Sequence, residues 1–277
     1  MATWFITGAA RGFGFEIARQ ALDRGDAVVA TARNPAALAN TLGPSEKLLV
    51  QPLDVTEAGQ AEAAVTAAVE RFGGIDVLVN NAGRGLLGAV EESTDAEVRA
   101  VYETNVFGLL TVTRAVLPVL RRQRSGHVLN IGSVGGFTTG AGWGVYGSTK
   151  FAVEGITEGL RAELAPLGIQ VTVVEPGVFR TDFLDASSLH TAAATIPDYA
   201  GSAGQVRGWA TESNHAQPGD PAKAAAAILR VALHPEAPAR LPLGADCVAR
   251  VVGKLANVEQ ELTRWRSLAM STGYDSN

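Results

Sequence analysis

The chain has 277 residues, of which 47% are hydrophobic and 18% charged, a composition typical of a globular protein with a well-filled core. The net charge of -5 argues against a nucleic-acid surface, which needs a basic face, and the single cysteine excludes an internal disulfide. No apolar run reaches the ~18 residues that span a bilayer, and the N-terminus lacks a basic signal segment, so we expect a cytoplasmic protein with no membrane contact. The four histidines show no ligand spacing, so we expect no metal site.

Short apolar runs alternate with helical patterns along most of the chain. The predicted strands are 3–7, 27–31, 47–53, 75–79, 127–131, 169–174 and 240–243. The predicted helices are 14–24, 56–72, 94–122, 146–164, 220–234 and 248–270. Continuous Val/Ile/Leu runs are typical of strands buried on both faces, and this alternation predicts right-handed βαβ units. The sequence therefore predicts a single α/β domain over 1–277, with a doubly wound parallel sheet of about seven strands and helices on both faces.

The region 179–218 interrupts this alternation with a stretch rich in Ala, Ser, Thr and Gly. A long, weakly patterned insertion in a compact domain is usually functional. We expect residues 3–182 to form the core, residues 183–218 to form a lid over a substrate, and residues 244–271 to contain a C-terminal helix.

A glycine-rich turn joins the first strand to the first helix. It reads Thr-Gly-Ala-Ala-Arg-Gly-Phe-Gly over 7–14. Glycines allow a close approach to a pyrophosphate, and the helix N-terminus offers free N–H groups to it. The alternative is an ordinary tight turn, but the position between strand and helix favours a dinucleotide site of the Rossmann fold. The predicted contacts are Gly8, Ala10, Arg11, Gly12, Phe13 and Gly14.

The second strand indicates which nicotinamide cofactor is preferred. An NAD enzyme usually carries an acid at the end of this strand, whereas this strand ends in Arg33. A guanidinium suits a 2′-phosphate, and Arg11 could reach the same group, although both arginines could instead be solvated. We therefore predict NADP(H) in preference to NAD(H). Asp54 and Val55 follow the third strand, where they either meet the adenine or cap the next loop.

These residues and four later motifs resemble the short-chain dehydrogenase/reductase family in its single-domain form. The later motifs are Asn-Asn-Ala-Gly at 80–83, Asn105, Ser133 with Tyr-x-x-x-Lys at 146–150, and Pro-Gly at 176–177. The resemblance covers residues 3–182. The stretches 86–91 and 150–155 are similar to the branch containing 17β-hydroxysteroid and retinol dehydrogenases, whose bacterial members act on many other ketones and alcohols.

The catalytic prediction rests on Tyr146 and Lys150, which lie four apart on one helix face. A nearby ammonium favours the phenolate, so we expect Lys150 to lower the pKa of Tyr146 and allow proton transfer near neutral pH. Ser133 follows the fifth strand and is placed to hydrogen-bond the substrate oxygen. The resemblance implies that Asn105 supports a water chain to Lys150.

The remaining site residues also follow the resemblance. It places Asn81, Ala82 and Gly83 along the cofactor, and it gives Tyr146 and Lys150 contacts with the nicotinamide ribose. Asn80 and Asn81 could equally stabilise the central sheet. The segment Pro176, Gly177, Val178 and Thr181 is expected beside the nicotinamide carboxamide. Trp143, Phe179 and Phe183 suggest an apolar substrate pocket, with core packing as the alternative.

Together these features predict an enzyme that moves a hydride between NADP(H) and a neutral, fairly hydrophobic ketone, aldehyde or secondary alcohol. The alternative is a non-catalytic NADP-binding regulator on the same fold. The helices 94–122 and 146–164 could pair across a two-fold axis, as in this family, so a homodimer or homotetramer is expected.

Overall fold

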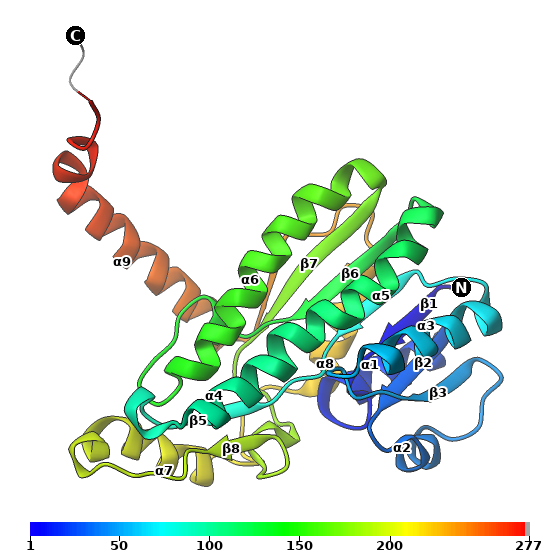
Figure 1. The fold of residues 1–277 in the computed structure, drawn as a ribbon, viewed down its shortest axis with the longest axis horizontal. Helices are drawn as coiled ribbons and strands as arrows, with labels where there is room; N and C mark the ends of the chain where they lie inside the picture. The colour runs from blue at the N-terminus through cyan, green and yellow to red at the C-terminus, as the bar shows by residue number, and fades with distance from the viewer. Residues whose placement is uncertain (275–277) are drawn as a thin grey trace.

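The computed structural model describes residues 1–274, and its centre is a seven-stranded parallel sheet (Figure 1). The strand order is β3-β2-β1-β4-β6-β7-β9. The strands are β1 (Thr3–Ile6), β2 (Ala27–Ala32), β3 (Leu48–Pro52), β4 (Val77–Asn80), β6 (Gly126–Ile131), β7 (Ile169–Pro176) and β9 (Arg240–Leu243). The chain runs outward from β1 to β3 and then returns to β4 beside β1, which makes a topological switch point. The predicted fold class is confirmed; the predicted domain limits of 1–277 include residues 275–277, which lie outside the described part.

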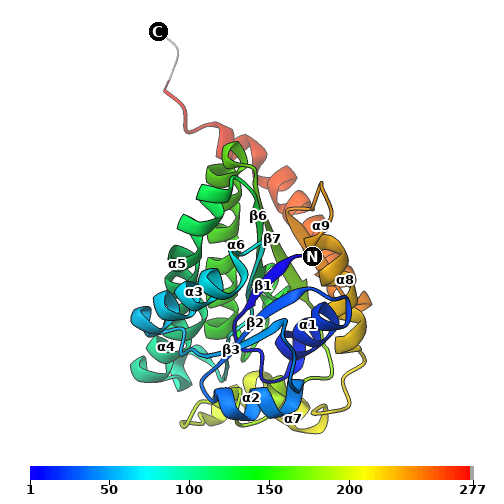
Figure 2. The same ribbon diagram turned by 90° about the vertical axis from the view of Figure 1, so that its right-hand side faces the viewer.

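Helices cover both faces of this sheet (Figure 2). One face carries α1 (Gly12–Asp23) and α8 (Pro221–Ala232), and the other carries α3 (Ala58–Phe72) and α5 (Gly108–Gln123), with α6 (Gly144–Leu164) packed on β7. Each helix buries an apolar face at helical spacing, such as Ile17, Ala18 and Ala21 of α1. Two apolar clusters therefore sandwich the sheet and fix its strand ends at one edge.

The structure adds a helix that the sequence analysis did not predict. This is α2 (Pro35–Leu42), which follows β2. Its signal is local: Asn34 accepts a hydrogen bond from Ala37 N at 3.3 Å, and Pro35 occupies the first helical position. Only Leu38 of this helix is buried, so it lacks the apolar periodicity on which the other predictions relied.

The predicted helix 94–122 has an irregular centre. It consists of α4 (Asp95–Tyr102), a π-helical turn η2 (Glu103–Phe107) and α5, with Thr94 and Glu97 forming a capping box at its start. A π-turn inserts one residue into the helical repeat, and such turns are often found at functional sites. Here the turn buries Asn105, which is 2% exposed.

The region 183–218 is ordered by elements that its sequence did not reveal. It contains β8 (Leu189–Thr191), which pairs in parallel with β5 (Gly85–Leu87), and α7 (Gln205–Glu212). Arg207 of α7 donates to both oxygens of buried Glu92, at 2.6 and 3.1 Å. The Arg207 hydrogen bonds, with those from the N–H groups of Ile196 and Ala89, lower the pKa of Glu92 to about 2. An ion pair therefore fastens this region to the body.

The last helix, α9 (Ala245–Met270), begins against the body and then projects away from it (Figure 1). Cys247 is its only buried residue, and every residue from 252 to 270 is exposed. Within residues 1–274, no helix combines the length and the apolar character needed to cross a membrane.

Buried His127 at the start of β6 makes the stability depend on pH. Burial lowers its pKa from 6.5 to about 4, and the charge of Arg161 acts in the same direction. As the pH falls from 6.5 toward 4, His127 takes up a proton in the unfolded chain and stays neutral in the folded chain. The free energy of unfolding therefore decreases in this pH range. At about 1.4 kcal/mol per pKa unit, the loss is about 3 kcal/mol. Denaturant unfolding from pH 7 to 4.5 should show it, and His127→Gln should show a flatter profile. Parallel profiles for the two proteins would contradict this role.

Candidate active site

A cavity of about 950 Å³ opens at the carboxyl edge of the sheet, beside the switch point between β1 and β4. The glycine turn, the ends of the central strands and the lid region line it. Ligands of open α/β sheets bind at this position. All predicted site residues line the cavity except Gly14 and Asn105.

The glycine turn is shaped by backbone geometry that only glycine adopts readily. Gly8 and Gly12 have φ of 64° and 56°. Asn81 Nδ2 donates to the carbonyl oxygens of Thr7 and Gly8, at 2.9 and 3.0 Å. A Cβ on Gly14 would lie 2.5 Å from Asn81 Nδ2. Gly14 therefore allows the turn to pack closely against Asn81. It was predicted to contact the cofactor, but it does not line the cavity.

The asparagines after β4 hold the sheet together at this edge. Asn80 Nδ2 donates to Thr113 Oγ1 and Asn130 Oδ1, both at 2.9 Å. The side chains of Asn80 and Asn81 thus stabilise the central sheet, which was the alternative to cofactor contact. Backbone at Asn81, Ala82 and Gly83 remains on the cavity wall.

The residues predicted to select the cofactor separate in the structure. Arg33 is exposed at the cavity edge after β2. Arg11 instead donates to Ser187 Oγ and Ser188 Oγ at 2.6 and 2.7 Å, so its guanidinium binds the lid rather than pointing to a site shared with Arg33. Asp54 Oδ1 accepts from Thr56 N at 3.1 Å and caps the following loop, the second of its two predicted roles.

The polar centre of the cavity is formed by Tyr146, Lys150 and Ser133. Both α6 residues are buried, at 8% and 6% exposure, and Lys150 Nζ lies 6.0 Å from the centre of the Tyr146 ring. Lys150 Nζ donates to Ile131 O at 2.8 Å. Ser133 Oγ accepts from Gly135 N at 3.0 Å, which fixes the hydroxyl after β6. This arrangement offers a phenol, a hydroxyl and an ammonium to one bound molecule.

Burial shifts the pKa of Tyr146 in the direction opposite to the predicted one. It raises the pKa of Tyr146 to about 12, opposed by a hydrogen bond with Ser133. Burial likewise lowers the pKa of Lys150 to about 8, opposed by the charge of Glu154. The prediction of a lowered tyrosine pKa is wrong for the free protein, because the loss of solvent outweighs the hydrogen bond with Ser133. Tyr146 is therefore protonated near neutral pH.

Asn105 contributes from behind the cavity. Its Nδ2 donates to Arg84 O and Thr149 Oγ1, at 2.9 and 3.0 Å, and its Oδ1 accepts from Arg84 N at 2.9 Å. Both amide hydrogens are thus used within the protein. Asn105 fixes the segment after Gly83 against α6, which is a positioning role; the water chain implied by the resemblance stays a prediction.

Aromatic side chains form the wall around Tyr146. Its ring lies 5.7 Å from Trp143 and 5.4 Å from Phe183, centre to centre. Phe179, also predicted to contact substrate, packs edge-on against Phe13 at 5.3 Å instead. Phe179 thus supports the glycine turn from within the same cavity, whereas Trp143 and Phe183 flank the reactive group.

The cavity is also lined by residues that the sequence does not identify as site residues, among them His190, Gln217 and Arg250. His190 lies on β8 and Arg250 on α9, far along the chain from Tyr146. Neither belongs to a motif, and only the folded topology brings them to the cavity.

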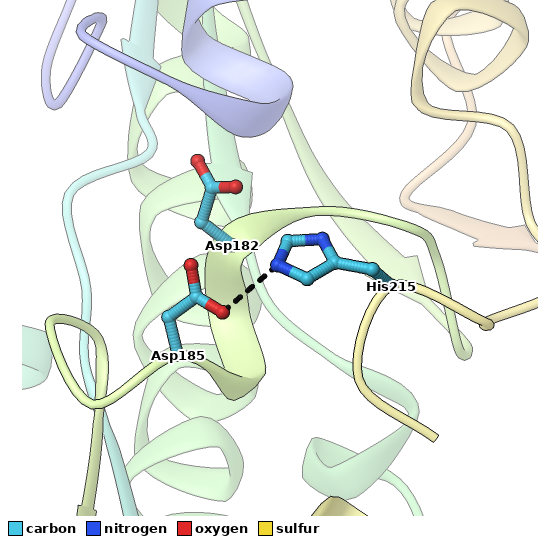
Figure 3. A group of neighbouring side chains, drawn as sticks. All are labelled: Asp182, Asp185 and His215. Atoms are coloured by element: carbon cyan, nitrogen blue, oxygen red, sulfur yellow. Dashed lines mark hydrogen bonds and ion pairs between the residues drawn. The ribbon is translucent and has the colours of Figure 1, made fainter. Parts of the chain in front are cut away.

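Two carboxylates and an imidazole meet at the lid, as Figure 3 shows for Asp182, Asp185 and His215. One ligand-type atom from each lies within 4.8 Å of the others. Asp185 Oδ1 accepts from Asn214 Nδ2 at 2.7 Å and from His215 Nε2 at 3.0 Å, and these bonds hold its pKa below the usual range. The contacts join the two ends of the lid; the expected lack of a metal centre stays a prediction.

Comparisons with known proteins agree with this geometry. A family model described as short chain dehydrogenase matches residues 2–191. An oxidoreductase of Botryotinia fuckeliana is 40% identical over 272 residues, covering 97% of this chain and 98% of that protein. The 3-ketodihydrosphingosine reductase of Bacteroides thetaiotaomicron is 39% identical over 197 residues, covering 71% of each. The solved structure of a short-chain dehydrogenase from Streptomyces avermitilis has a TM-score of 0.91 and 41% identity, covering 99% of this chain and 100% of that one.

Proposed function

Because this chain belongs to the short-chain dehydrogenase family, we propose that it is an NADP(H)-dependent oxidoreductase acting on a neutral, fairly hydrophobic ketone, aldehyde or secondary alcohol. The observation that carries the proposal is the placement of Tyr146 between Ser133, Lys150 and two aromatic rings in the cavity beside the glycine turn. Residues 3–182 supply cofactor binding and chemistry, and residues 183–218 close over the substrate.

The cavity fits a dinucleotide. Gly8 has a backbone conformation that disfavours side chains, and a Cβ there would approach Ala82 to 3.0 Å. The N-terminus of α1 points its free N–H groups at this turn, where a pyrophosphate is stabilised. Lys150 uses one of its three N–H donors on Ile131 and keeps two for ribose hydroxyls. When bound, NADPH supplies the hydride that reduces the carbonyl carbon.

The chain's own residues manage the proton and the developing charge. Tyr146 donates its phenolic proton to the carbonyl oxygen as that oxygen becomes an alkoxide. The hydroxyl of Ser133 hydrogen-bonds the same oxygen and stabilises its negative charge. Lys150 then stabilises the phenolate that remains on Tyr146. Trp143 and Phe183 exclude water from this reaction.

Arg33 supports NADP(H) over NAD(H), because it is an exposed guanidinium where NAD enzymes place a carboxylate. The apolar wall formed by Trp143 and Phe183 favours a hydrophobic substrate. A ketone is favoured because one relative is named as a 3-ketodihydrosphingosine reductase. We also propose a cytoplasmic homo-oligomer that binds no nucleic acid. Exposed Phe107 and Phe151, on the adjacent elements η2 and α6, support self-association there.

The test is the consumption of NADPH and, separately, of NADH with a panel of ketones and aldehydes. The proposal expects turnover with NADPH that exceeds turnover with NADH. Turnover favouring NADH would support the proposed oxidoreductase activity and overturn the proposed preference for NADP(H). Tight NADPH binding with no turnover across apolar ketones of graded size would favour the regulator.

The pH dependence should differ between the two reaction directions. Reduction needs the protonated phenol, which predominates below a pKa of about 12, so its kcat/KM should be nearly flat below pH 8. Oxidation needs the phenolate, whose population rises about tenfold per pH unit. Oxidation should therefore climb until Lys150 loses its charge, near its pKa of about 8, and then level off. An oxidation rate already constant below pH 7 would contradict the high tyrosine pKa.

A further inference from the structure

The outer part of α9 exposes an apolar surface that the redox site does not use. Its large side chains are 43–64% exposed: Val252, Leu255, Val258, Leu262, Trp265 and Leu268. In Figure 1 this part of the helix stands clear of the other elements, so nothing within residues 1–274 covers it. Monomeric proteins rarely expose a contiguous apolar surface of this kind.

Four of these six residues, together with Val248, follow a seven-residue repeat, and Val252 and Leu268 lie beside it. Val248, Leu255 and Leu262 are seven apart, and Val258 and Trp265 are seven apart and follow Leu255 and Leu262 by three. This alternation of three and four is the a and d pattern of a coiled coil, which places one narrow seam along the helix. A seam of this type matches another helix with the same repeat.

The charges beside the seam indicate which helix that is. Lys254 and Glu259 are five apart at the g and following e positions, and so are Glu261 and Arg266. In a parallel, in-register pair, a g residue faces the following e residue of the other helix. Both pairings join opposite charges, and two-fold symmetry forms each of them twice. The surface is therefore complementary to itself.

We propose that α9 pairs with α9 of a second copy as a parallel two-stranded coiled coil. The proposal does not depend on the redox activity. A membrane surface is the weaker match, because helices that lie on membranes carry mainly Lys and Arg on their polar face. Residues 252–270 carry three basic residues, Lys254, Arg264 and Arg266, and also two acidic ones, Glu259 and Glu261.

The first test is the mass of the particle in solution, measured by light scattering over a range of micromolar concentrations. Leu255→Glu with Leu262→Glu places four carboxylates in the paired seam and should halve the mass. The matched control, Gln260→Glu with Ser267→Glu, adds the same charge to the opposite face and should leave the mass unchanged. Unchanged NADPH binding and thermal unfolding of the body would show that both variants fold. Equal masses for wild type and the seam variant would overturn the proposal.

A second test addresses the orientation and the partner. Trp265→Cys should form a disulfide between copies under mild oxidation only if the helices are parallel, and buried Cys247 does not compete. Lys254→Glu should weaken association, and adding Glu259→Lys should restore it. Failure of the cysteine to cross-link would overturn the parallel arrangement. Seam-dependent binding of wild type to vesicles with anionic lipids, with equal masses for wild type and the seam variant, would assign the surface to membranes instead.

Discussion

Tyr146→Phe should lower kcat for ketone reduction by about 10²- to 10⁴-fold, the usual contribution of a positioned general acid. The substitution removes only the hydroxyl, so the ring keeps its packing against Trp143 and Phe183. NADPH binding and thermal stability should therefore change little. Initial rates and fluorescence titration of NADPH measure the two effects separately.

The control for this variant is Tyr102→Phe. The Tyr102 hydroxyl donates to Ser148 Oγ at 2.9 Å and lies outside the cavity. It should cost some stability and leave kcat nearly unchanged. A Tyr146→Phe enzyme with full turnover would refute the assigned proton donor. Loss of NADPH binding together with turnover would show that the hydroxyl serves the cofactor rather than the proton transfer.

Arg33→Ala should lower kcat/KM for NADPH by about ten- to one-hundred-fold while leaving the value for NADH nearly unchanged. A hydrogen bond to a charged group contributes about 1.5–3 kcal/mol, and the 2′-phosphate that Arg33 is proposed to meet exists only in NADPH. Side-by-side kinetics with both cofactors measure the ratio.

Arg24→Ala is the matched control, because Arg24 precedes the opposite end of β2 and pairs with Asp26 at 3.2 Å. It should change neither cofactor's kinetics. An equal fall for both cofactors in Arg33→Ala would assign Arg33 to the adenosine or to folding. Unchanged kinetics with NADPH would leave the preference to other residues and refute the role of Arg33.

The central sheet could be predicted because its strands are buried on both faces and therefore carry unbroken apolar runs. β9 at the sheet edge has the limits that were predicted, 240–243, although its four residues are only half-buried. The helix α2 could not be predicted from apolar periodicity, since a helix with one buried residue leaves no periodic pattern. The lid elements escaped for a related reason: β8 exists through its pairing with β5, about a hundred residues earlier in the chain.

The candidate site was predictable where spacing along one element determines the arrangement. Tyr146 and Lys150 share a helix face, and Ser133 follows a strand end, so their convergence follows from topology. Burial of Tyr146 is a property of the assembled cavity, and its effect on the pKa had the opposite sign to the expected one. The same limit applies to Arg11, whose partners Ser187 and Ser188 lie in a loop with no pattern of its own.

The π-turn between α4 and α5 limits how the chain length can vary. It holds one residue more than an α-helical turn, and it places Asn105 against Arg84 and Thr149. Deleting one residue of 103–107 would close the widened turn into the regular α-helical repeat. The amide of Asn105 would then no longer be held toward Arg84 and Thr149. Homologous chains should consequently differ in length in the exposed lid loops and keep a constant number of residues between Thr94 and Gly108.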